Sequence, residues 1–427
     1  MTERRRRGIL ALLGANGISA LGTRMSMLAI PWFVLTTTGS AAETGIVAFA
    51  ETAPYVLLMA FGGPWVDRLG AWRVAIASEL LAGAAIGLIP LLHFTGDLSL
   101  PVLALLAGAA GAVRGAGDTG NRVLVPALAD EARMPLERAS GLFDGISRVA
   151  SMVGVPLAGV LIAATSAPLV IVIDAASFVA SGIILAGLVP RTSQPAPHPE
   201  ERDAGYLQRL SQGLRHLRGD RLLLGIAFMV LVTNLVDAAT ASVLLPLWGA
   251  ERLGSPVGIG LMSGAFGLGA VSGNAVLTWL APRLPRRLVY GVGFLVCGAP
   301  RLVALAVAST VEPMLVVMFV AGFGAGSINP ILGAVEYERV PRHLQARVMG
   351  AIGALAWAGI PIGPILGGAG AELMGLVTTL WIAAAIYLAA TLVPFIFPVW
   401  REMDRRPGPA DGRAERGVQD HRAMEVR

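Results

Sequence analysis

The stretch GGPWVDRLGAWR, residues Gly62 to Arg73, places three charged side chains between two long apolar runs. About 20 apolar residues are enough to cross a bilayer as a helix, so we predict that this stretch is a loop joining two membrane spans. Its glycines permit a tight turn, and its carboxylate and guanidinium groups can bind helix ends and backbone carbonyls. The residues that carry this pattern are Gly63, Asp67, Arg68, Gly70 and Arg73.

The composition also indicates a membrane protein. Of the 427 residues, 55% are hydrophobic and 14% are charged. In a soluble domain about 25% of the residues are charged. The 53 glycines suit membrane helices whose backbones approach closely.

All 33 basic residues are arginines, which excludes functions that require a lysine. A Walker A phosphate loop and a Schiff base both need one, so the chain does not itself drive transport with ATP. The absence of lysine also indicates a bacterial source with a high-GC genome.

The sequence offers no cluster of residues for a metal or redox centre. Cys297 is the single cysteine, and the five histidines lie at the edges of apolar runs or in polar segments. We expect no enzymatic activity, no cofactor, no metal and no nucleic-acid partner.

Twelve apolar runs are long enough to span a bilayer, which predicts an all-α membrane protein. Apart from Arg24, Arg114, Arg148 and Arg301, which lie deep inside these runs, and Arg252, every arginine lies at a terminus, in a loop on the side of the N-terminus, or at the end of a run on that side. The positive-inside rule therefore places both termini in the cytoplasm and the chain in a cell inner or plasma membrane. The runs cover residues 9–35, 42–64, 73–93, 100–123, 139–164, 167–189, 222–248, 256–280, 287–309, 314–335, 346–370 and 375–399.

The runs fall into two groups of six. A polar cytoplasmic segment at 191–220 separates residues 1–190 from residues 221–400, and we expect residues 401–427 to be a disordered tail. At an offset of 215 residues the two halves share prolines, glycines and an Arg-Leu pair in one frame. Six plus six spans with weak internal symmetry are typical of transporters built from repeated halves. The matched positions include Pro31 with Pro246, Gly39 with Gly254, Ser40 with Ser255, Gly45 with Gly260 and Arg68 with Arg283.

The G-x3-D-R-x-G-x2-R pattern of the opening loop resembles the loop signature of the major facilitator superfamily. The resemblance implies twelve transmembrane helices in two pseudo-symmetric six-helix bundles around a central cavity. It also implies a charged latch that holds the bundles together on the cytoplasmic side. Ala71 and Trp72 stand where the family usually has basic residues. An ordinary positive-inside loop is the alternative.

Span eleven carries a second glycine pattern, which resembles the antiporter motif that exporters of this superfamily usually have in span five. Span five keeps only Pro156 and Gly159 of that motif. Glycines at every fourth position form a groove on one helix face, and a proline bends the helix, so we expect this face to let the two bundles close against each other. Ordinary helix packing with a proline kink is the alternative. The pattern consists of Gly350, Gly359, Gly363, Pro364, Gly367 and Gly368.

Ionisable side chains inside spans are energetically unfavourable, so each is a candidate for the substrate or proton pathway. In the first half they are Arg24, Glu51, Arg114, Asp118, Asp144, Arg148 and Asp174. In the second half they are Asp237 and Arg301, accompanied by the polar Asn234 and Asn329.

Depth in the membrane suggests how some of these residues act. Arg24 and Glu51 lie well inside neighbouring spans, and a carboxylate that releases an arginine when protonated is a proton switch. A permanent ion pair between them is the alternative. Asp118 lies on the same helix face as Arg114, near the cytoplasmic end and within reach of the loop arginines, which indicates a structural or gating role.

The remaining candidates have more than one interpretation. Asp144 and Arg148 are four residues apart, which allows either an ion pair or a role in the cavity. Asp174 is expected to make a structural bond near the outer end of span six. Asn234 and Asp237 lie three residues apart in span seven and suit a cationic or polar substrate, and Asp237 is the second candidate, after Glu51, for proton coupling.

Further stretches, including IPWFVLTTTGS at 30–40 and RHLQARVMG at 342–350, resemble the branch of the superfamily that exports macrolides, other drugs and siderophores. The resemblance implies proton antiport of an amphiphilic small molecule by alternating access, with the proton gradient as the energy source. The expected partners are the substrate, protons and the lipid bilayer, and we expect a monomer. The alternatives are a dedicated exporter of one host product such as a siderophore or antibiotic, an importer, and a membrane scaffold or sensor without transport.

Overall fold

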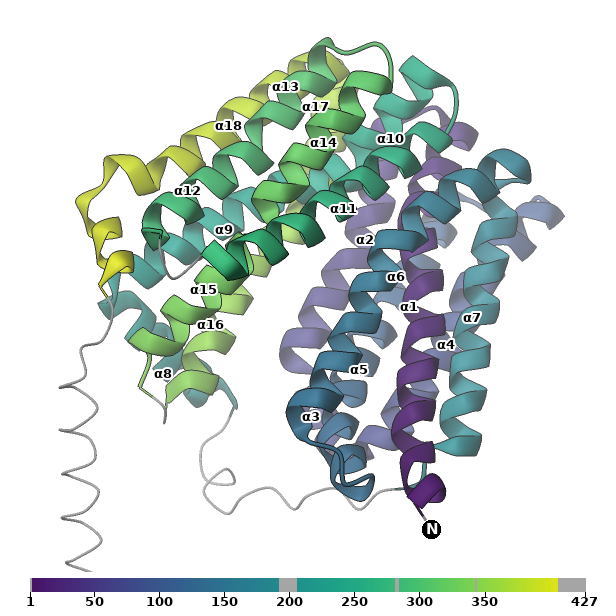
Figure 1. Ribbon diagram of the computed structural model, residues 1–427. Helices are drawn as coiled ribbons and strands as arrows, with labels where there is room; N and C mark the ends of the chain where they lie inside the picture. Colours follow the sequence, from purple (N-terminus) through teal and green to yellow (C-terminus); the bar gives the residue numbers. More distant parts are fainter. Residues whose placement is uncertain (1, 192–205, 281–283, 342–343, 406–427) are drawn as a thin grey trace, which may run out of the picture.

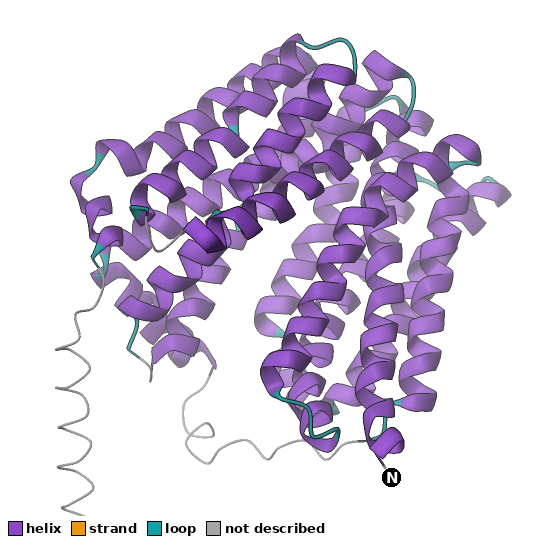
Figure 2. Ribbon diagram, in the orientation of Figure 1, coloured by secondary structure: helices purple, strands orange, loops and turns teal. Residues whose placement is uncertain are grey.

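The computed structural model of the protein describes residues 2–191, 206–280, 284–341 and 344–405. Within these ranges the chain forms helices joined by short loops and contains no strand (Figure 2). In the described part of the chain, twelve helical segments are long and apolar enough to cross a membrane. They coincide with the twelve predicted runs to within a few residues, except for longer extensions at some ends, and confirm the all-α membrane fold.

The N-terminal half has six long helices and one short one. The first and third long helices end at glycines with φ of 72° and 81°, a conformation that favours glycine. The bounds are α1 (Thr2–Thr38), α2 (Ala41–Phe61), the short α3 (Gly63–Leu69), α4 (Ala71–Thr95), α5 (Leu100–Glu131), α6 (Leu136–Ala164) and α7 (Ala167–Leu188).

The C-terminal half has six membrane spans, four of which are divided into shorter pieces. Span seven consists of α9 (Arg221–Ala239), the π-helical turn η2 (Thr240–Leu244), α10 (Leu245–Trp248) and a second π-helical turn, η3 (Gly249–Leu253). The others are α11 (Val257–Leu280), α12 (Arg286–Cys297) with α13 (Ala299–Val307), α14 (Glu312–Ala325) with α15 (Ile328–Arg339), α16 (Gln345–Trp357) with α17 (Gly359–Met374), and α18 (Leu376–Ile396).

Prolines explain where three of these spans divide. Pro300, Pro330 and Pro361 follow the breaks in spans nine, ten and eleven within two or three residues. A proline has no backbone N–H, so it leaves a carbonyl of the preceding turn without its helical donor. Discontinuous helices of this kind occur in transporters where backbone lines a cavity.

The two halves meet on one side of the molecule and part on the other (Figure 1). The main contacts between them are α2 with α17 and α6 with α11. The N-terminus and α3 lie on the side where the halves part, which we call the open side; the opposite side is the closed side.

The segment between the halves differs from the predicted loop. Its last part forms a helix, α8 (Tyr206–Gly219), which packs against α16 and buries Leu217. Alternating apolar and polar residues at helical spacing give α8 this packing face. The predicted tail also begins later than expected, because residues 398–404 form a 3-10 helix, η6 (Pro398–Asp404), that buries Met403. The rest of both segments, 192–205 and 406–427, lies outside the described residues.

Candidate functional site

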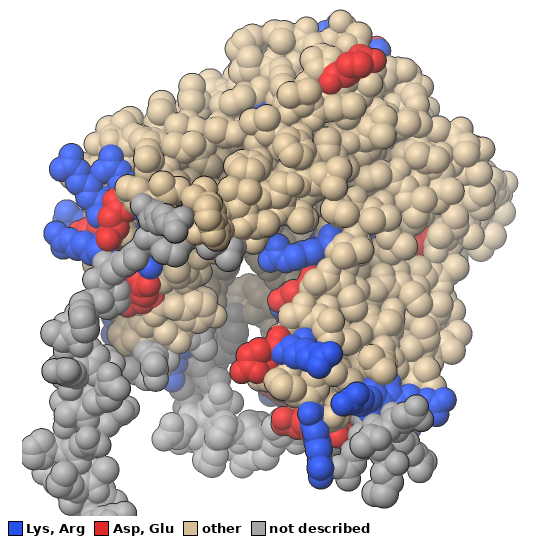
Figure 3. Space-filling model, viewed as in Figure 1, with Lys and Arg blue, Asp and Glu red and all other residues tan. Residues whose placement is uncertain are grey.

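A hollow separates the halves on the open side, and charged side chains line its wall on the N-terminal half (Figure 3). Within the N-terminal half Glu51 of α2 and Arg114 of α5 form an ion pair, with 2.8 Å between Arg114 Nη1 and Glu51 Oε1. Gly111 and Gly115 allow this contact, because any side chain at either position would overlap the backbone of α2. Both charged side chains remain about one-fifth exposed, at 19% for Arg114 and 20% for Glu51.

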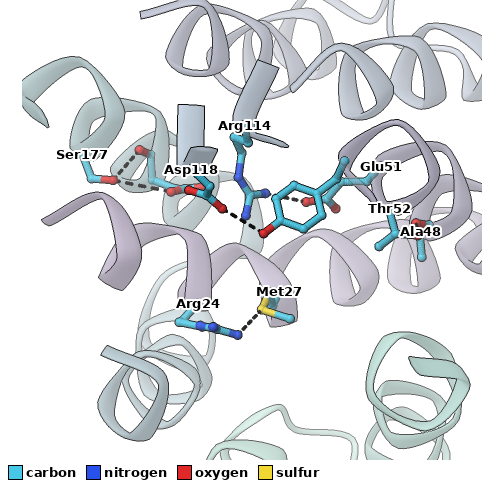
Figure 4. A network of polar contacts seen from close by, with 10 residues as sticks. Arg24, Met27, Ala48, Glu51, Thr52, Arg114, Asp118 and Ser177 are labelled. Atoms are coloured by element: carbon cyan, nitrogen blue, oxygen red, sulfur yellow. Dashed lines mark hydrogen bonds and ion pairs between the residues drawn. The ribbon is translucent and has the colours of Figure 1, made fainter. Parts of the chain in front are cut away.

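Aromatic rings and a second acid surround this pair. The Arg114 guanidinium lies 5.7 Å from the ring centre of Tyr55 and 5.9 Å from that of Phe178, within the range of cation–π attraction. The Tyr55 hydroxyl donates a hydrogen bond of 2.8 Å to Asp118. The chain therefore holds two acids and one arginine together inside the membrane (Figure 4).

The predicted pair of Arg24 with Glu51 does not form. Glu51 is bonded to Arg114 instead, because α2 packs closely against α5 and only loosely against α1. The Arg24 guanidinium points toward Met27 one turn away, with 3.3 Å between Nη1 and the Met27 sulfur (Figure 4). Among the described residues Arg24 has no acidic partner within ion-pair distance.

Three further predictions for the N-terminal half can be compared with the structure. Asp118 is bonded to Tyr55 and not to the loop arginines, which are exposed on α3 and α4. Asp144 and Arg148 are both exposed and, within the described part of the chain, do not pair with each other. Asp174 does make local bonds as expected, because Ser177 Oγ lies 3.5 Å from its carboxylate.

In the C-terminal half Asp237 of α9 forms an ion pair with Arg301 of α13. The guanidinium also lies 5.9 Å from the ring centre of Phe266. Asn234 donates a 2.9 Å hydrogen bond to the carbonyl of Ala356, next to the break between α16 and α17, and so satisfies a backbone group near that break. Asn329 is exposed on α15.

The charged loop of the opening stretch forms α3 and the start of α4. Gly70 joins the two helices with φ of 94°, which explains the glycine at this position. Trp72 donates a 3.0 Å hydrogen bond to the carbonyl of Val189 at the end of α7, so it ties the loop to its own half. The two halves stand apart here (Figure 1), and the predicted latch between them is not formed in this structure. Its charged residues Asp67, Arg68 and Arg73 are exposed and form no ion pair with any described residue. Gly63 is the first residue of α3.

The glycine face of span eleven packs within its own half, and not between the two bundles as predicted. Side chains at Gly359, Gly363 or Gly367 would overlap α9, which belongs to the same half, so this face does not join the two bundles. The next face does: a side chain at Gly368 would overlap Ala41 of α2, and the Pro364 carbonyl occupies the space beside Gly45. Gly350 has open space around it.

The structure places two acids that sequence reasoning missed at notable positions, one between the two halves and one inside the N-terminal half. Glu372 of α17 accepts hydrogen bonds across the closed side from Ser40 Oγ at 3.2 Å and the backbone N–H of Ala41 at 3.1 Å. Glu79 of α4 is buried inside the N-terminal half. Glu79 stands in the middle of an apolar run, a signal that the sequence did contain. Glu372 stands near a span end and gave no such signal.

Comparisons with known proteins agree with this architecture. The sequence profile of the Major Facilitator Superfamily matches residues 12–256 and 227–423. The multidrug efflux pump Tap of Mycobacterium tuberculosis is 31% identical over 399 residues, which cover 93% of this chain and 94% of that protein. The multidrug efflux pump Tap of Mycolicibacterium fortuitum is 28% identical over 415 residues, covering 96% of this chain and 100% of that protein. The chain belongs to the major facilitator superfamily, and it is a multi-pass membrane transporter rather than an enzyme.

Solved structures share the fold at low sequence identity. A bacterial homologue of the human lysosomal transporter Spinster, in an inward-facing and unoccupied conformation, has a TM-score of 0.69 at 15% identity, covering 95% of this chain and 99% of that one. The nucleoside transporter NupG has a TM-score of 0.67 at 12% identity, covering 91% of this chain and 99% of that one.

Proposed function

We propose that the protein exports an amphiphilic small molecule from the cytoplasm in exchange for protons. The hollow would open alternately to the two sides of the membrane. The similarity to two multidrug efflux pumps over nearly the whole chain supports export and a broad substrate class. The positive-inside rule makes the open side, which carries the N-terminus, the cytoplasmic side.

The observation that carries the proton coupling is the partly exposed Glu51–Arg114 ion pair inside the N-terminal half (Figure 4). An ionised Glu51 holds the guanidinium, whereas a protonated Glu51 loses the attraction and frees Arg114 to move. A proton that binds to Glu51 therefore changes which groups Arg114 can bind. A substrate in the hollow would compete with the proton, because each alters the interactions of Arg114. Asp237 is bonded to Arg301 in the C-terminal half and is the second candidate for the same role.

The amphiphilic substrate class follows from the mixture of groups around the hollow. The guanidinium of Arg24 lies beside Met27, whose side chain is 47% exposed, so a charged group and a soft apolar group are adjacent. A flexible thioether adapts to apolar bodies of different shape. We propose that these two residues contact the substrate.

Transport in proteoliposomes tests the proposal. Vesicles that are acidified inside should accumulate a fluorescent amphiphile such as ethidium, because each substrate enters as protons leave through molecules whose cytoplasmic side faces outward. Glu51→Gln should abolish this accumulation but keep counterflow exchange, which needs no proton gradient. Asp97→Asn, a change at an exposed loop acid, is the matched control. If vesicles with the unaltered protein accumulate ethidium equally with and without a proton gradient, the antiport proposal is contradicted.

A further inference from the structure

The N-terminal half contains a second group of polar side chains, which meet around a glycine where two helices approach closely. They lie where α1 packs against α7, with α4 beside them, and we call them the polar seam. On α1 and on α7 the members occur at the same spacing of i, i+3 and i+7, so each helix presents them on one face. A side chain at Gly22 would overlap Asp174 and Ser177, which shows how closely the helices approach. The members are Ser19, Gly22 and Ser26 of α1, Glu79 of α4, and Asp174, Ser177 and Ser181 of α7.

The two acids of the seam are buried without a cation of their own. Glu79 is 7% exposed and Asp174 is 1% exposed. Neither forms an ion pair with any described residue. The Ser19 and Ser181 hydroxyls face the Glu79 carboxyl, and the Ser26 and Ser177 hydroxyls face the carboxyl of Asp174.

Hydrogen bonding in the seam is incomplete. Glu79 Oε2, Ser181 Oγ and Ser26 Oγ are all buried and, among the described residues, have no hydrogen-bond partner at ordinary distance. Burial makes an ionised carboxylate at either position strongly unfavourable, and the serine hydroxyls compensate for the lost water only in part. The surroundings of both acids therefore suit the protonated form.

Each seam acid is electrostatically linked to one acid of the hollow. The charged groups that act on Glu79 are Asp118 and Arg114, both on α5. Those that act on Asp174 are Arg114 and, from α2, Glu51. Arg114 thus interacts with acids of both groups, and in this structure it donates its hydrogen bond to Glu51.

We propose that Glu79 and Asp174 form a second proton-binding site, which holds protons in the conformation seen here, in which the two halves part on the open side. Its protons exchange with the hollow through the neighbouring carboxylates of Asp118 and Glu51. In this exchange the proton that leaves Asp174 is taken up by Glu51. The neutral Glu51 loses its attraction for Arg114, whose charge then stabilises the ionised Asp174, so the two acids together hold the same number of protons before and after the transfer. This inference rests on the proposed proton antiport and adds a store to it.

Proton release by the purified full-length protein tests the inference. Ethidium is added to the protein in weakly buffered detergent solution, and a pH-indicator dye reports the protons released per ethidium bound. The unaltered protein should release protons when ethidium binds. Glu79→Gln and Asp174→Asn should each release at most about half as many protons per ethidium bound, while their affinity for ethidium changes little. Both substitutions keep the shape of the side chain and its ability to bond to serine. Asp97→Asn should release as many protons as the unaltered protein.

A second measurement covers the case in which a variant does not fold. Infrared difference spectroscopy of the unaltered protein should show the carbonyl stretch of buried protonated carboxyl groups disappear when ethidium binds. Undiminished proton release in both variants, or no such band in the unaltered protein, overturns the inference. If the unaltered protein releases no protons at all, the proposed antiport fails together with it.

Discussion

Arg114 keeps its charge inside the membrane because its partners compensate for the loss of water. Glu51 neutralises it at 2.8 Å, and the faces of Tyr55 and Phe178 add cation–π attraction. Arg24 has only the thioether of Met27 as a hydrogen-bond partner among the described residues. The two arginines repel each other and have different partners, which agrees with the different roles proposed for them: Arg114 in proton coupling and Arg24 in substrate binding.

We predict that Arg24→Gln weakens the binding of an amphiphile that carries a carboxylate. Loss of one charge-assisted hydrogen bond should reduce its affinity about tenfold, whereas the methyl ester of the same compound should bind as before. Arg24→Lys keeps the charge and is the matched control. The readout is the ligand-induced rise in melting temperature for the acid and the ester. Equal losses for both compounds would show that Arg24 does not contact the charged group.

Asp220 makes a different kind of contact, at the start of α9 on the surface. Its carboxylate accepts hydrogen bonds from the N–H groups of Leu222 at 3.0 Å and Leu223 at 3.1 Å, and from Arg339 Nε at 2.8 Å. Partial burial acts to raise the pKa of Asp220, but the Arg339 guanidinium and the two N–H groups outweigh it and lower the pKa below its ordinary value. A depressed pKa means that the folded state is stabilised once the carboxylate is ionised.

We therefore predict that Asp220→Ala lowers the melting temperature in detergent by about 2–4 °C at neutral pH, as expected for loss of a helix cap. The contribution should be present above the unfolded pKa of about 4 and should vanish as pH falls through the lower folded pKa. Asp97→Ala, which removes an exposed acid without such bonds, should leave the melting temperature unchanged. A difference between Asp220→Ala and the unaltered protein that persists in strong acid would contradict this explanation.

The elements of the fold were predictable to different degrees. Runs of apolar residues locate the spans, because a helix in lipid must be apolar over its whole length. The same runs do not show which helices are neighbours, so Glu51 was assigned to Arg24 although Arg114 lies at a similar depth on the helix that α2 contacts. The breaks in spans nine to eleven had a signal, in Pro300, Pro330 and Pro361, that hydropathy alone does not reveal.

Helix α17 makes a contact that holds the two halves together on the closed side. Glu372 accepts bonds from Ser40 Oγ and from the N–H groups of Ala41 and Ala42 at the start of α2, where the helix dipole also favours a negative charge. Gly45 and Gly368 bring the two backbones together beside it. Sequence reasoning placed the closing face one step away, on Gly363, because a periodic pattern defines a face of a helix without defining its neighbour.

We predict that Glu372→Gln loosens the closed side. Opening can be measured with the variant Ile259→Cys in a Cys297→Ser background, because Ile259 of α11 is buried against the N-terminal half. The new cysteine should react with a membrane-impermeant maleimide only when the closed side opens. Replacing a charged acceptor by a neutral amide should speed the reaction about tenfold. Glu43→Gln, in the first turn of the same helix α2, is the control. Equal rates for all three proteins would mean that Glu372 does not hold the halves together.

The molecule as a whole is closed on one side and open on the other (Figure 1). The closed side is held by α2 with α17 and α6 with α11, whereas the charged residues of α3 face solvent across the open side without an ion-pair partner among the described residues. Two six-helix halves that pivot about such contacts would bring α3 toward the C-terminal half when the open side closes. The superfamily could be recognised from the loop pattern of α3, but the conformation of the molecule could not, since one sequence would serve both states of the proposed transport cycle.

The distance between the halves on the open side tests this account most directly. Spin labels at Leu69 of α3 and Tyr337 of α15, both exposed, can be placed in a Cys297→Ser background and measured by double electron–electron resonance in lipid nanodiscs. The account predicts two distances, the longer one matching the present structure, with a ratio that changes with pH and with bound ethidium, and with a loss of the pH response in Glu51→Gln. A single distance that neither pH nor ethidium alters would contradict alternating access driven by protons.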